Sequence, residues 1–400
     1  MARRGFGLKI TLSEKMNDFK TLIFSELANY KKQKLLEGKE IIDLSIGSPD
    51  LPPPASVIEE LQNNVQDPSQ YGYSLTGTEA LHQAIGDYYH RQFDVSLHTE
   101  KDIVVVMGSQ DGIVHLPMVL TNPGDTILVP DPGYTAYDAG LSLAGAIPYK
   151  MPLKEENHFL PDLDKIPLEV REKAKLMILN FPGNPVPTLA TKEFFEKVVQ
   201  FANEHQILVI HDFAYSELYY EEKPHSFLTI EGAKEVGVEF NSLSKSFNMA
   251  GCRIGYIVGN EQIITGMNRL KSNLDYGVFL PIQKAAISAL THSASFSEEL
   301  RCIYKERRNL LINGLNELGW AVPSPKASMF VWAKVPEPYT STDFAYKLIN
   351  EAGIVVTPGN AFGKEGEGYV RIALTQNVEV LEKAVLKLKE LNCFNKGCFR

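Results

Sequence analysis

The sequence predicts an α/β protein, with a large domain built on a mostly parallel sheet and a smaller α+β domain after it. Between residues 103 and 258, short and continuously apolar segments alternate with helical segments. Strands that are apolar on both faces are typical of parallel sheets covered by helices on both sides. After Pro281 the alternation stops, and a long helical region precedes short strands and further helices.

The segments before the sheet are expected to be helices joined by ordered loops. A strand is expected over residues 41–46, and the three prolines after Leu51 exclude a helix or central strand there. An aromatic, turn-rich loop covers residues 71–74. Helical patterns cover residues 14–37, 57–65 and 79–93.

Within the sheet region the strand and helix signals alternate. Strands are expected at residues 103–107, 127–129, 176–180, 207–210 and 253–258. Helices are expected at residues 108–120, 134–144 and 191–205. The last helix is the strongest, because its apolar residues recur at helical spacing after Thr191, a suitable N-cap.

The chain after Pro281 predicts the smaller domain. Its elements are a helical region over 282–318, strands near 327–335 and 368–374, and helices over 342–351 and 378–391. We therefore expect three parts. They are an N-terminal arm and helix (1–45) that packs with the small domain or a partner subunit, a large domain (46–285) and a small C-terminal domain (286–400).

Composition excludes several classes of function. The chain has 400 residues, a net charge of -9 and a pI near 5.6. Nucleic acid and anionic membranes both need a basic surface, so neither is an expected partner. No apolar run reaches the roughly 18 residues of a membrane helix, and the first ten residues lack the apolar core of a secretory signal.

The four cysteines predict a reducing, cytoplasmic location, because their density is low. Cys393 and Cys398 form a C-x4-C pair with no histidine nearby. Free thiols near a frayed terminus are the expected state there, and no metal site is expected.

The most informative stretch runs from Glu239 to Gly259 and carries Lys245 in the turn between two strands. Most lysines are solvated surface charges, but Lys245 lies between apolar segments. Burial lowers the pKa of an amine, and the neutral amine is a nucleophile. The hydroxyls of Ser242 and Ser244 and the guanidinium of Arg253 are phosphate ligands by type. An amine beside a phosphate clamp indicates a phosphorylated aldehyde, of which pyridoxal phosphate is the common one.

The S-x-S-K segment, followed by small residues and R-x-G, resembles the lysine segment of the class I/II aminotransferases, which are fold-type I pyridoxal-phosphate enzymes. The resemblance covers residues 43–391. The form N-M-A-G-C-R-I-G-Y is most similar to the branch of LL-diaminopimelate aminotransferases and methionine-type transaminases. The resemblance implies a seven-stranded sheet, a homodimer and pyridoxal 5'-phosphate as cofactor.

The resemblance also assigns the phosphate of the cofactor to the start of a helix. Gly108, Ser109 and Gln110 follow a strand and open a helix, where backbone N–H groups bind phosphate. With Ser242, Ser244 and Arg253 they would form a phosphate cup. Tyr73, or else Tyr71, is expected to reach the phosphate of a neighbouring subunit, and Tyr73 is favoured.

Three further segments match the positions that hold the cofactor ring. Asp212, in H-D-F-A-Y, would pair with the pyridine nitrogen, which improves the ring as an electron sink; a helix N-cap or a loop carboxylate is its alternative role. Tyr215 and Asn184 match the residues that contact the phenolic oxygen. Tyr134 matches the aromatic residue that stacks on the ring, with a core aromatic as the alternative.

Arg371, in G-Y-V-R-I-A-L, is the expected ligand of the substrate carboxylate. An arginine inside an apolar strand needs an anionic partner, and its planar fork suits a carboxylate. An internal salt bridge is the alternative. Gly47 and Asn184 match positions that contact the same carboxylate.

Two segments depart from the family pattern. The loop written N-P-x-N-P-T-G in relatives appears here with Val186 and Pro187 in place of Thr-Gly, which leaves the loop shape open. Cys252 occupies a position where many relatives have Trp.

These assignments predict a transaminase in which Lys245 holds the cofactor as an internal aldimine and then moves the Cα proton. The donor is expected to be LL-diaminopimelate, methionine, alanine or an aromatic amino acid, and the acceptor a 2-oxo acid such as 2-oxoglutarate. A carbon–sulfur β-lyase is the main alternative, because it shares the fold, the lysine and the aspartate. A regulator would need a DNA-binding module, for which about 40 residues leave no room, and a scaffold would not need Lys245, Asp212 and Arg371 together.

Overall fold

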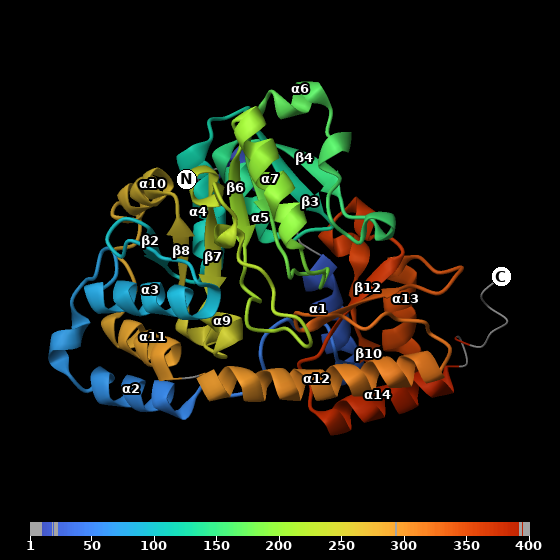
Figure 1. Ribbon diagram of the computed structural model, residues 1–400. Coiled ribbons are helices and arrows are strands. Elements are labelled where there is room, and N and C mark those ends of the chain that lie inside the picture. The colour runs from blue at the N-terminus through green and yellow to red at the C-terminus, as the bar shows by residue number, and fades with distance from the viewer. Residues whose placement is uncertain (1–9, 18, 20–22, 293, 392–393, 395–400) are drawn as a thin grey trace, which may run out of the picture.

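A computed structural model describes residues 10–17, 19, 23–292, 294–391 and 394. Its centre is a seven-stranded sheet with the strand order β2-β8-β7-β6-β5-β3-β4 (Figure 1). Only β8 runs antiparallel to its neighbours among these strands, so the prediction of a mostly parallel sheet is confirmed. The strands are β2 (Ile103–Val106), β3 (Thr126–Asp131), β4 (Ile147–Pro152), β5 (Ala174–Leu179), β6 (Leu208–Asp212), β7 (Gly237–Ser242) and β8 (Gly255–Gly259).

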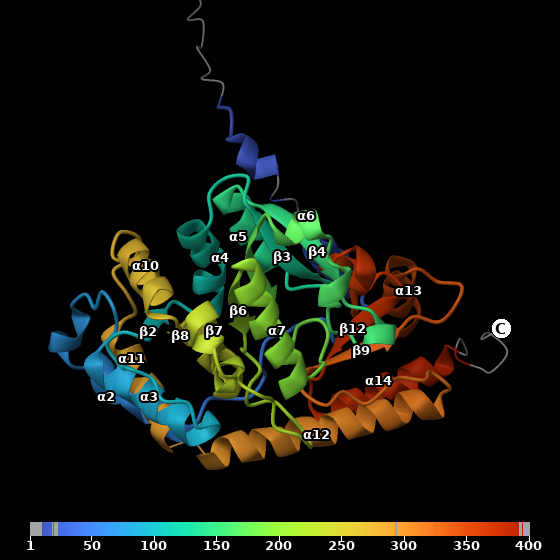
Figure 2. The ribbon, with the colours of Figure 1, turned by 45° about the horizontal axis from the view of Figure 1, so that its top comes forward.

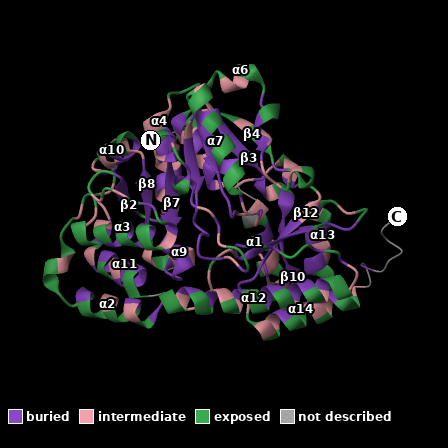
Figure 3. Ribbon diagram, viewed as in Figure 1, coloured by how far each residue is buried: buried purple, intermediate pink, exposed green. Residues whose placement is uncertain are grey.

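Helices cover both faces of this sheet, because alternate residues of each strand point to opposite sides. Val104 and Val106 lie in one apolar cluster with helices α4 (Ser109–Leu120), α5 (Ala136–Ala144) and α10 (Glu261–Lys271). Ile103 and Val105 lie in the opposite cluster with α2 (Ala55–Val65), α3 (Glu79–Phe93), α7 (Lys192–His205) and α11 (Leu280–His292). Figure 3 shows the sheet buried between helices whose outer faces are exposed.

The smaller α+β part lies at one end of the sheet (Figure 2). It contains the antiparallel order β11-β12-β9 and the parallel pair β1-β10, which joins the N-terminal segment to the C-terminal part. Its strands are β1 (Ile42–Asp43), β9 (Phe330–Lys334), β10 (Ile354–Val355), β11 (Thr357–Pro358) and β12 (Tyr369–Ala373). Its helices are α1 (Ile23–Leu36), α12 (Ala294–Glu317), α13 (Ser341–Lys347) and α14 (Val378–Glu390). Short helices α6 (Leu168–Arg171), α8 (Ala233–Val236) and α9 (Leu243–Ser246) belong to the large part.

Several predicted boundaries are wrong for identifiable reasons. The strand expected over 41–46 is limited to β1, because the carbonyls of Ser45 and Ile46 accept hydrogen bonds from the side chains of Arg371 and Thr375 instead of from a neighbouring strand. The strand expected from Arg253 begins at Gly255, because Arg253 has a left-handed backbone with φ 52°. The sequence missed β4, an exposed edge strand that contains two prolines.

The helical predictions also need correction at the ends. The region 282–318 consists of two helices, α11 and α12. The region 14–37 contains a 3₁₀ turn (Glu14–Asn17) and α1. The predicted division into 1–45, 46–285 and 286–400 stays a prediction, and its second boundary falls within α11. Cys393 and Cys398 lie outside the described residues.

Candidate active site

A cavity of about 180 Å³ lies where the parallel strands of the large part end. It brings together eleven of the residues that the sequence singled out, from segments far apart in the chain. These are Gly47, Ser109, Gln110, Tyr134, Asn184, Asp212, Tyr215, Ser242, Ser244, Lys245 and Arg253. Arg371 lines an adjoining cavity that shares Gly47, Tyr134 and Asn184 with the first.

Lys245 projects into this cavity from α9, directly after β7. Its Nζ atom donates a hydrogen bond to the carbonyl oxygen of Gly47 at 2.6 Å. Burial, together with the positive charges of Arg371 and Arg253, lowers the pKa of Lys245 to about 8. A substantial fraction of the amine is therefore neutral near pH 7, as a nucleophile or a base requires.

The predicted phosphate cup is built around Gly108. This residue has φ +80°, and a Cβ atom there would lie 2.5 Å from Nη2 of Arg253. Glycine therefore allows both the left-handed turn and the close approach of the guanidinium. Arg253 is held by the carbonyls of Ala250 (3.1 Å) and Met107 (3.4 Å). The amide groups at the start of the twelve-residue helix α4 lie beside it, as an anion site requires.

Ser242 and Ser244, which precede Lys245, line the cavity together with Arg253. Ser242 caps α9, and its Oγ accepts a hydrogen bond from the amide of Ser244 at 3.2 Å. A Cβ atom on Gly255 would lie 2.9 Å from the amide nitrogen of Ser109, so strand β8 and the start of α4 can approach closely only with glycine there. The two hydroxyls, the α4 amides and Arg253 form a donor set suited to a phosphate group.

Asp212 lies at the end of β6 with its carboxyl group buried. Tyr137 donates a hydrogen bond to its Oδ2 at 2.8 Å, and the amide of Ala214 donates to its Oδ1 at 3.3 Å. Burial raises the pKa of Asp212, while the hydrogen bonds and the charge of His211 act against that rise. No regular helix begins at Asp212, so the N-cap alternative is wrong. A cation in the cavity would stabilise the ionised carboxylate.

The loop after β5 places Asn184. Asn180 fixes this loop, because its Nδ2 donates to the carbonyl of Asp212 (2.7 Å) and its Oδ1 accepts from the amide of Asn184 (2.9 Å). Val186 is buried against Trp332 and Phe362, and Thr191 caps α7 through the amide of Phe194. The departure from the family pattern at Val186 and Pro187 thus leaves the helix start intact.

Arg371 is buried in strand β12 without an acidic partner among the described residues, so the structure does not support an internal salt bridge. Nη1 donates to Oδ1 of Asn184 (2.7 Å), and Nη2 donates to the carbonyl of Ser45 (2.6 Å). Nε has no hydrogen-bond partner in the described part of the chain. Burial lowers the pKa of Arg371 to about 10. A buried guanidinium with unused donor capacity is suited to bind a carboxylate.

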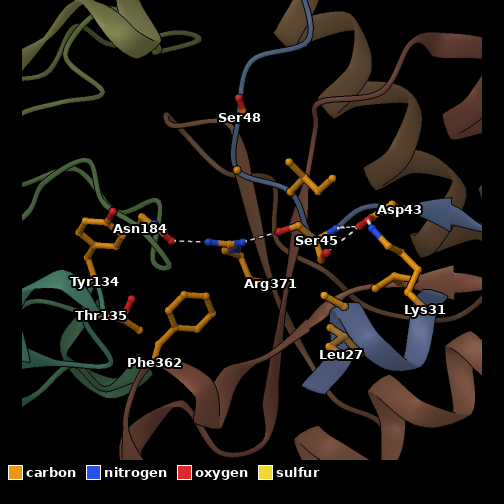
Figure 4. Close-up of a pocket in the computed structure, with 14 residues that line it drawn as sticks. Leu27, Lys31, Asp43, Ser45, Ser48, Tyr134, Thr135, Asn184, Phe362 and Arg371 are labelled. Atoms are coloured by element: carbon orange, nitrogen blue, oxygen red, sulfur yellow. Dashed lines mark hydrogen bonds and ion pairs between the residues drawn. The ribbon is translucent and has the colours of Figure 1, made fainter. Parts of the chain in front are cut away.

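The adjoining cavity has a volume of about 430 Å³ and extends from Arg371 to helix α1 (Figure 4). At its far end Lys31 of α1 forms an ion pair with Asp43 of β1 at 2.7 Å. Ser45 donates its amide and hydroxyl hydrogens to the other carboxylate oxygen of Asp43. Leu27, Ile46, Val355 and Phe362 supply apolar walls between the two charged ends.

Several residues in and around these cavities carry no prediction from the sequence. Tyr137, which holds Asp212, lies three residues after Tyr134, and the helix expected over residues 134–144 would place both on one face, so helical spacing could have indicated it. Asn180 follows an apolar strand, and Asp212 ends one. A polar residue at the end of an apolar strand could therefore have indicated Asn180 as well. Lys31 and Asp43 have no comparable signal, because their contact depends on how α1 packs on the small domain.

Tyr73 and Tyr71 lie outside both cavities. Tyr73 is 86% exposed and contacts the ring of Tyr276, with 5.2 Å between ring centroids. Tyr71 is 63% exposed and contacts Phe279 at the same distance. The expected role of Tyr73 in a neighbouring subunit stays a prediction.

The comparisons with known proteins agree with this geometry. The sequence model of the family described as "Aminotransferase class I and II" matches residues 39–388. The chain belongs to this family. Members are pyridoxal-phosphate enzymes, and the phosphate donor set, the buried Asp212 and the lowered pKa of the Lys245 amine fit that cofactor. The protein is thus a pyridoxal-phosphate-dependent aminotransferase.

Individual relatives are similar over nearly the whole length of this aminotransferase. The LL-diaminopimelate aminotransferase of Aquifex aeolicus is 42% identical over 381 residues, which covers 95% of this chain and 98% of that protein. The enzyme of the same name from Halothermothrix orenii is 43% identical, and the alignment covers 94% of this chain and 97% of that protein. The substrate-bound BacF structure from Bacillus is 40% identical in sequence and superposes with a TM-score of 0.92. The superposition covers 96% of this chain and 98% of that one.

The comparisons support the transaminase over the β-lyase alternative, because both of these sequence relatives are named aminotransferases. In the part of the chain that the structure describes, no helix is long and apolar enough to cross a membrane.

Proposed function

We propose that this aminotransferase moves the amino group of an L-amino acid to a 2-oxo acid such as 2-oxoglutarate, with Lys245 as the catalytic base and acid. The observation that carries the proposal is the place of the Lys245 amine. It shares a cavity with the phosphate-type donor set around Arg253, and it donates to Gly47, which also lines the adjoining cavity of Arg371.

Each residue then has a separate task. Bound pyridoxal phosphate supplies an electron sink that acidifies the Cα proton of the amino acid. Arg371 and Asn184 bind the α-carboxylate and so fix which bond at Cα faces the cofactor. The amine of Lys245 takes the Cα proton and returns it to the cofactor carbon, since one group within reach of both atoms suffices for a 1,3 transfer. Asp212 would hold the proton on the ring nitrogen of the cofactor, Tyr215 and Asn184 would contact its phenolic oxygen, and Tyr134 would stack on the ring.

For the amino donor we propose LL-diaminopimelate. The names of the two sequence relatives support this choice, and so does the charge pattern of the larger cavity. This donor has a second amino and carboxyl end, joined to the first by a short methylene chain. With its first carboxylate on Arg371, the methylenes meet the apolar walls and the dipolar end meets Lys31 and Asp43.

The ion pair discriminates between donors by charge. A single distal carboxylate that drew Lys31 away would leave the mostly buried Asp43 without a counter-charge, which is costly. A dipolar end satisfies both side chains at once. Methionine, alanine and aromatic amino acids leave the pair intact, so they remain the alternative donors.

We also propose that the enzyme works as a cytoplasmic homodimer, with Tyr73 of one subunit at the phosphate site of the other. Exposed aromatic residues support this proposal. Tyr71, Tyr73, Tyr276 and Phe279 form two ring pairs on one face, where a monomer gains nothing from exposing them. Light scattering measures the mass directly, and a monomer at micromolar concentration would contradict the proposal.

A panel of single amino donors with 2-oxoglutarate tests the proposed reaction. LL-diaminopimelate is expected to give the highest kcat/KM, with formation of glutamate. If methionine or phenylalanine is instead preferred, the transaminase assignment stands and the proposed donor is wrong. If pyruvate and ammonia form without an acceptor, the β-lyase alternative applies.

A further inference from the structure

A second charged pair, formed by His211 and Glu239, lies directly beneath the candidate active site. His211 precedes Asp212 in strand β6, and Glu239 is its register partner on the parallel strand β7. Both side chains are completely buried. Neither lines the cavities described above, because consecutive residues of a strand point to opposite faces and Asp212 takes the cavity side.

The hydrogen bonds of Glu239 are those of an ionised carboxylate. Oε1 accepts from the hydroxyls of Tyr89 (2.9 Å) and Ser226 (2.8 Å). Oε2 accepts from the amide of Phe227 (2.8 Å) and lies 2.8 Å from Nδ1 of His211. An ionised carboxylate offers about four lone-pair sites. Three are used by the amide of Phe227, which can only donate, and by two hydroxyls oriented as donors, and the fourth faces the imidazole.

The other nitrogen of His211 must carry a proton. Nε2 lies 3.0 Å from the carbonyl oxygen of Phe181, which can only accept. With Nε2–H required by Phe181 and Nδ1–H suited to the ionised Glu239, both ring nitrogens are donors, and the ring is an imidazolium. The rings of Phe195, Phe213 and Phe227 surround it within 6.4 Å, which leaves Glu239 as its counter-charge.

This pair acts on the active site by two routes. The positive charge of His211 favours the ionised form of the adjacent Asp212, whose burial otherwise raises its pKa. The bond to Phe181 also fixes the loop that carries Asn184, while Asn180 ties the same loop to the carbonyl of Asp212.

We propose that His211 is a positioning residue, which Glu239 holds as an imidazolium so that Asp212 is ionised and ready for the cofactor nitrogen. The titratable groups that face this pair are Tyr89 of α3, Glu239 of β7 and Asp212 of β6. The proposal concerns the charge state of the protein and goes beyond the choice of substrate.

The ¹⁵N NMR spectrum of histidine-labelled protein tests the charge state without any turnover. The expected result is that both ring nitrogens of His211 are protonated, in the cofactor-free and the loaded protein alike. His211→Gln identifies the signal, and if that variant does not fold, the exchange protection of the buried ring identifies it instead. A single protonated nitrogen in the wild-type spectrum overturns the proposal.

His211→Gln also has a second readout. Gln is neutral but can still donate one hydrogen bond, so a packing role is largely preserved. The pH at which the cofactor absorbance band titrates is expected to move by about one pH unit, with a roughly tenfold weaker cofactor affinity. His98→Gln, at an exposed position, is the control and leaves both unchanged. A His211→Gln protein with wild-type titration and affinity contradicts the proposal.

Discussion

The amine of Lys245 donates a hydrogen bond to the carbonyl oxygen of Gly47 at 2.6 Å, although 198 residues separate them in the sequence. Gly47 also lies beside Arg371 and on the wall of the larger cavity. The contact therefore joins the proposed catalytic amine to the proposed carboxylate site.

The lowered pKa of Lys245 predicts how fast the cofactor-free protein captures pyridoxal phosphate. Only the neutral amine attacks an aldehyde, so the association rate is expected to rise with pH and level off above an inflection near 8. At pH 7 the neutral fraction is roughly 300-fold larger than for an ordinary lysine. Stopped-flow absorbance over pH 6–10 measures the profile.

A variant that removes one cause of the lowered Lys245 pKa is the control for this prediction. Arg371→Met removes one of the two positive charges that lower the pKa, so the inflection is expected to move to higher pH. An inflection near 10 in the wild-type protein would show that the amine is solvated in the free enzyme.

Arg371→Lys keeps the positive charge but removes the planar fork. Hydrogen bonds to charged groups contribute about 1.5–3 kcal/mol, so kcat/KM for the amino donor is expected to fall roughly 10- to 150-fold. Cofactor affinity should stay close to that of the wild type, because the phosphate cup is separate. Steady-state kinetics and a cofactor titration measure the two effects. Arg301→Lys, which pairs with Glu217 outside the cavities, is the matched control.

Gly108→Ala tests the phosphate cup. Alanine at φ 80° and ψ 154°, a region essentially restricted to glycine, costs about 1–3 kcal/mol, and its Cβ atom would displace the guanidinium of Arg253. Cofactor affinity is expected to fall at least about tenfold, since a charge-assisted contact is weakened. Gly251→Ala is the control, because nothing lies within 4 Å of the added Cβ atom. Equal affinities in the two variants would place the phosphate elsewhere.

Lys31→Gln tests the proposed donor. The neutral side chain loses its attraction for the distal carboxylate, so kcat/KM for LL-diaminopimelate is expected to fall about tenfold or more, and that for methionine to change little. Lys34→Gln is the control on the same helix, since Lys34 pairs with Glu37 away from the cavity. An equal loss for both donors would indicate that the Lys31–Asp43 pair only anchors α1.

The sequence predicted the sheet from local signals, and the family resemblance supplied most of the residues assigned to the site. Asp212 and Lys245 follow apolar strands, and parallel strands end at one edge of a sheet, so their proximity follows from the pattern alone. Strand β4 was missed because half-exposed edge strands lack a continuous apolar run. The start of β8 was misplaced because the left-handed backbone of Arg253 serves the phosphate cup rather than the strand.

Residues whose role depends on long-range packing could not be predicted in this way. His211 is a neighbour of Asp212 in the sequence, yet its partner Glu239 is identified only by the register of β6 against β7. Lys31 meets Asp43 only because β1 pairs with β10, more than 300 residues later. Neither pairing has a local sequence signal.

The most direct test of the account is a single half-reaction with Lys245→Ala. The cofactor-loaded protein is mixed with LL-diaminopimelate without an acceptor, and the absorbance change and the released 2-oxo acid are measured, with Lys305→Ala, an exposed lysine of α12, as control. The wild type and the control are expected to complete one turnover, and Lys245→Ala to be slower by at least about 10² to 10⁴, the contribution of a positioned general base. A Lys245→Ala protein that converts the donor at the wild-type rate would contradict the account.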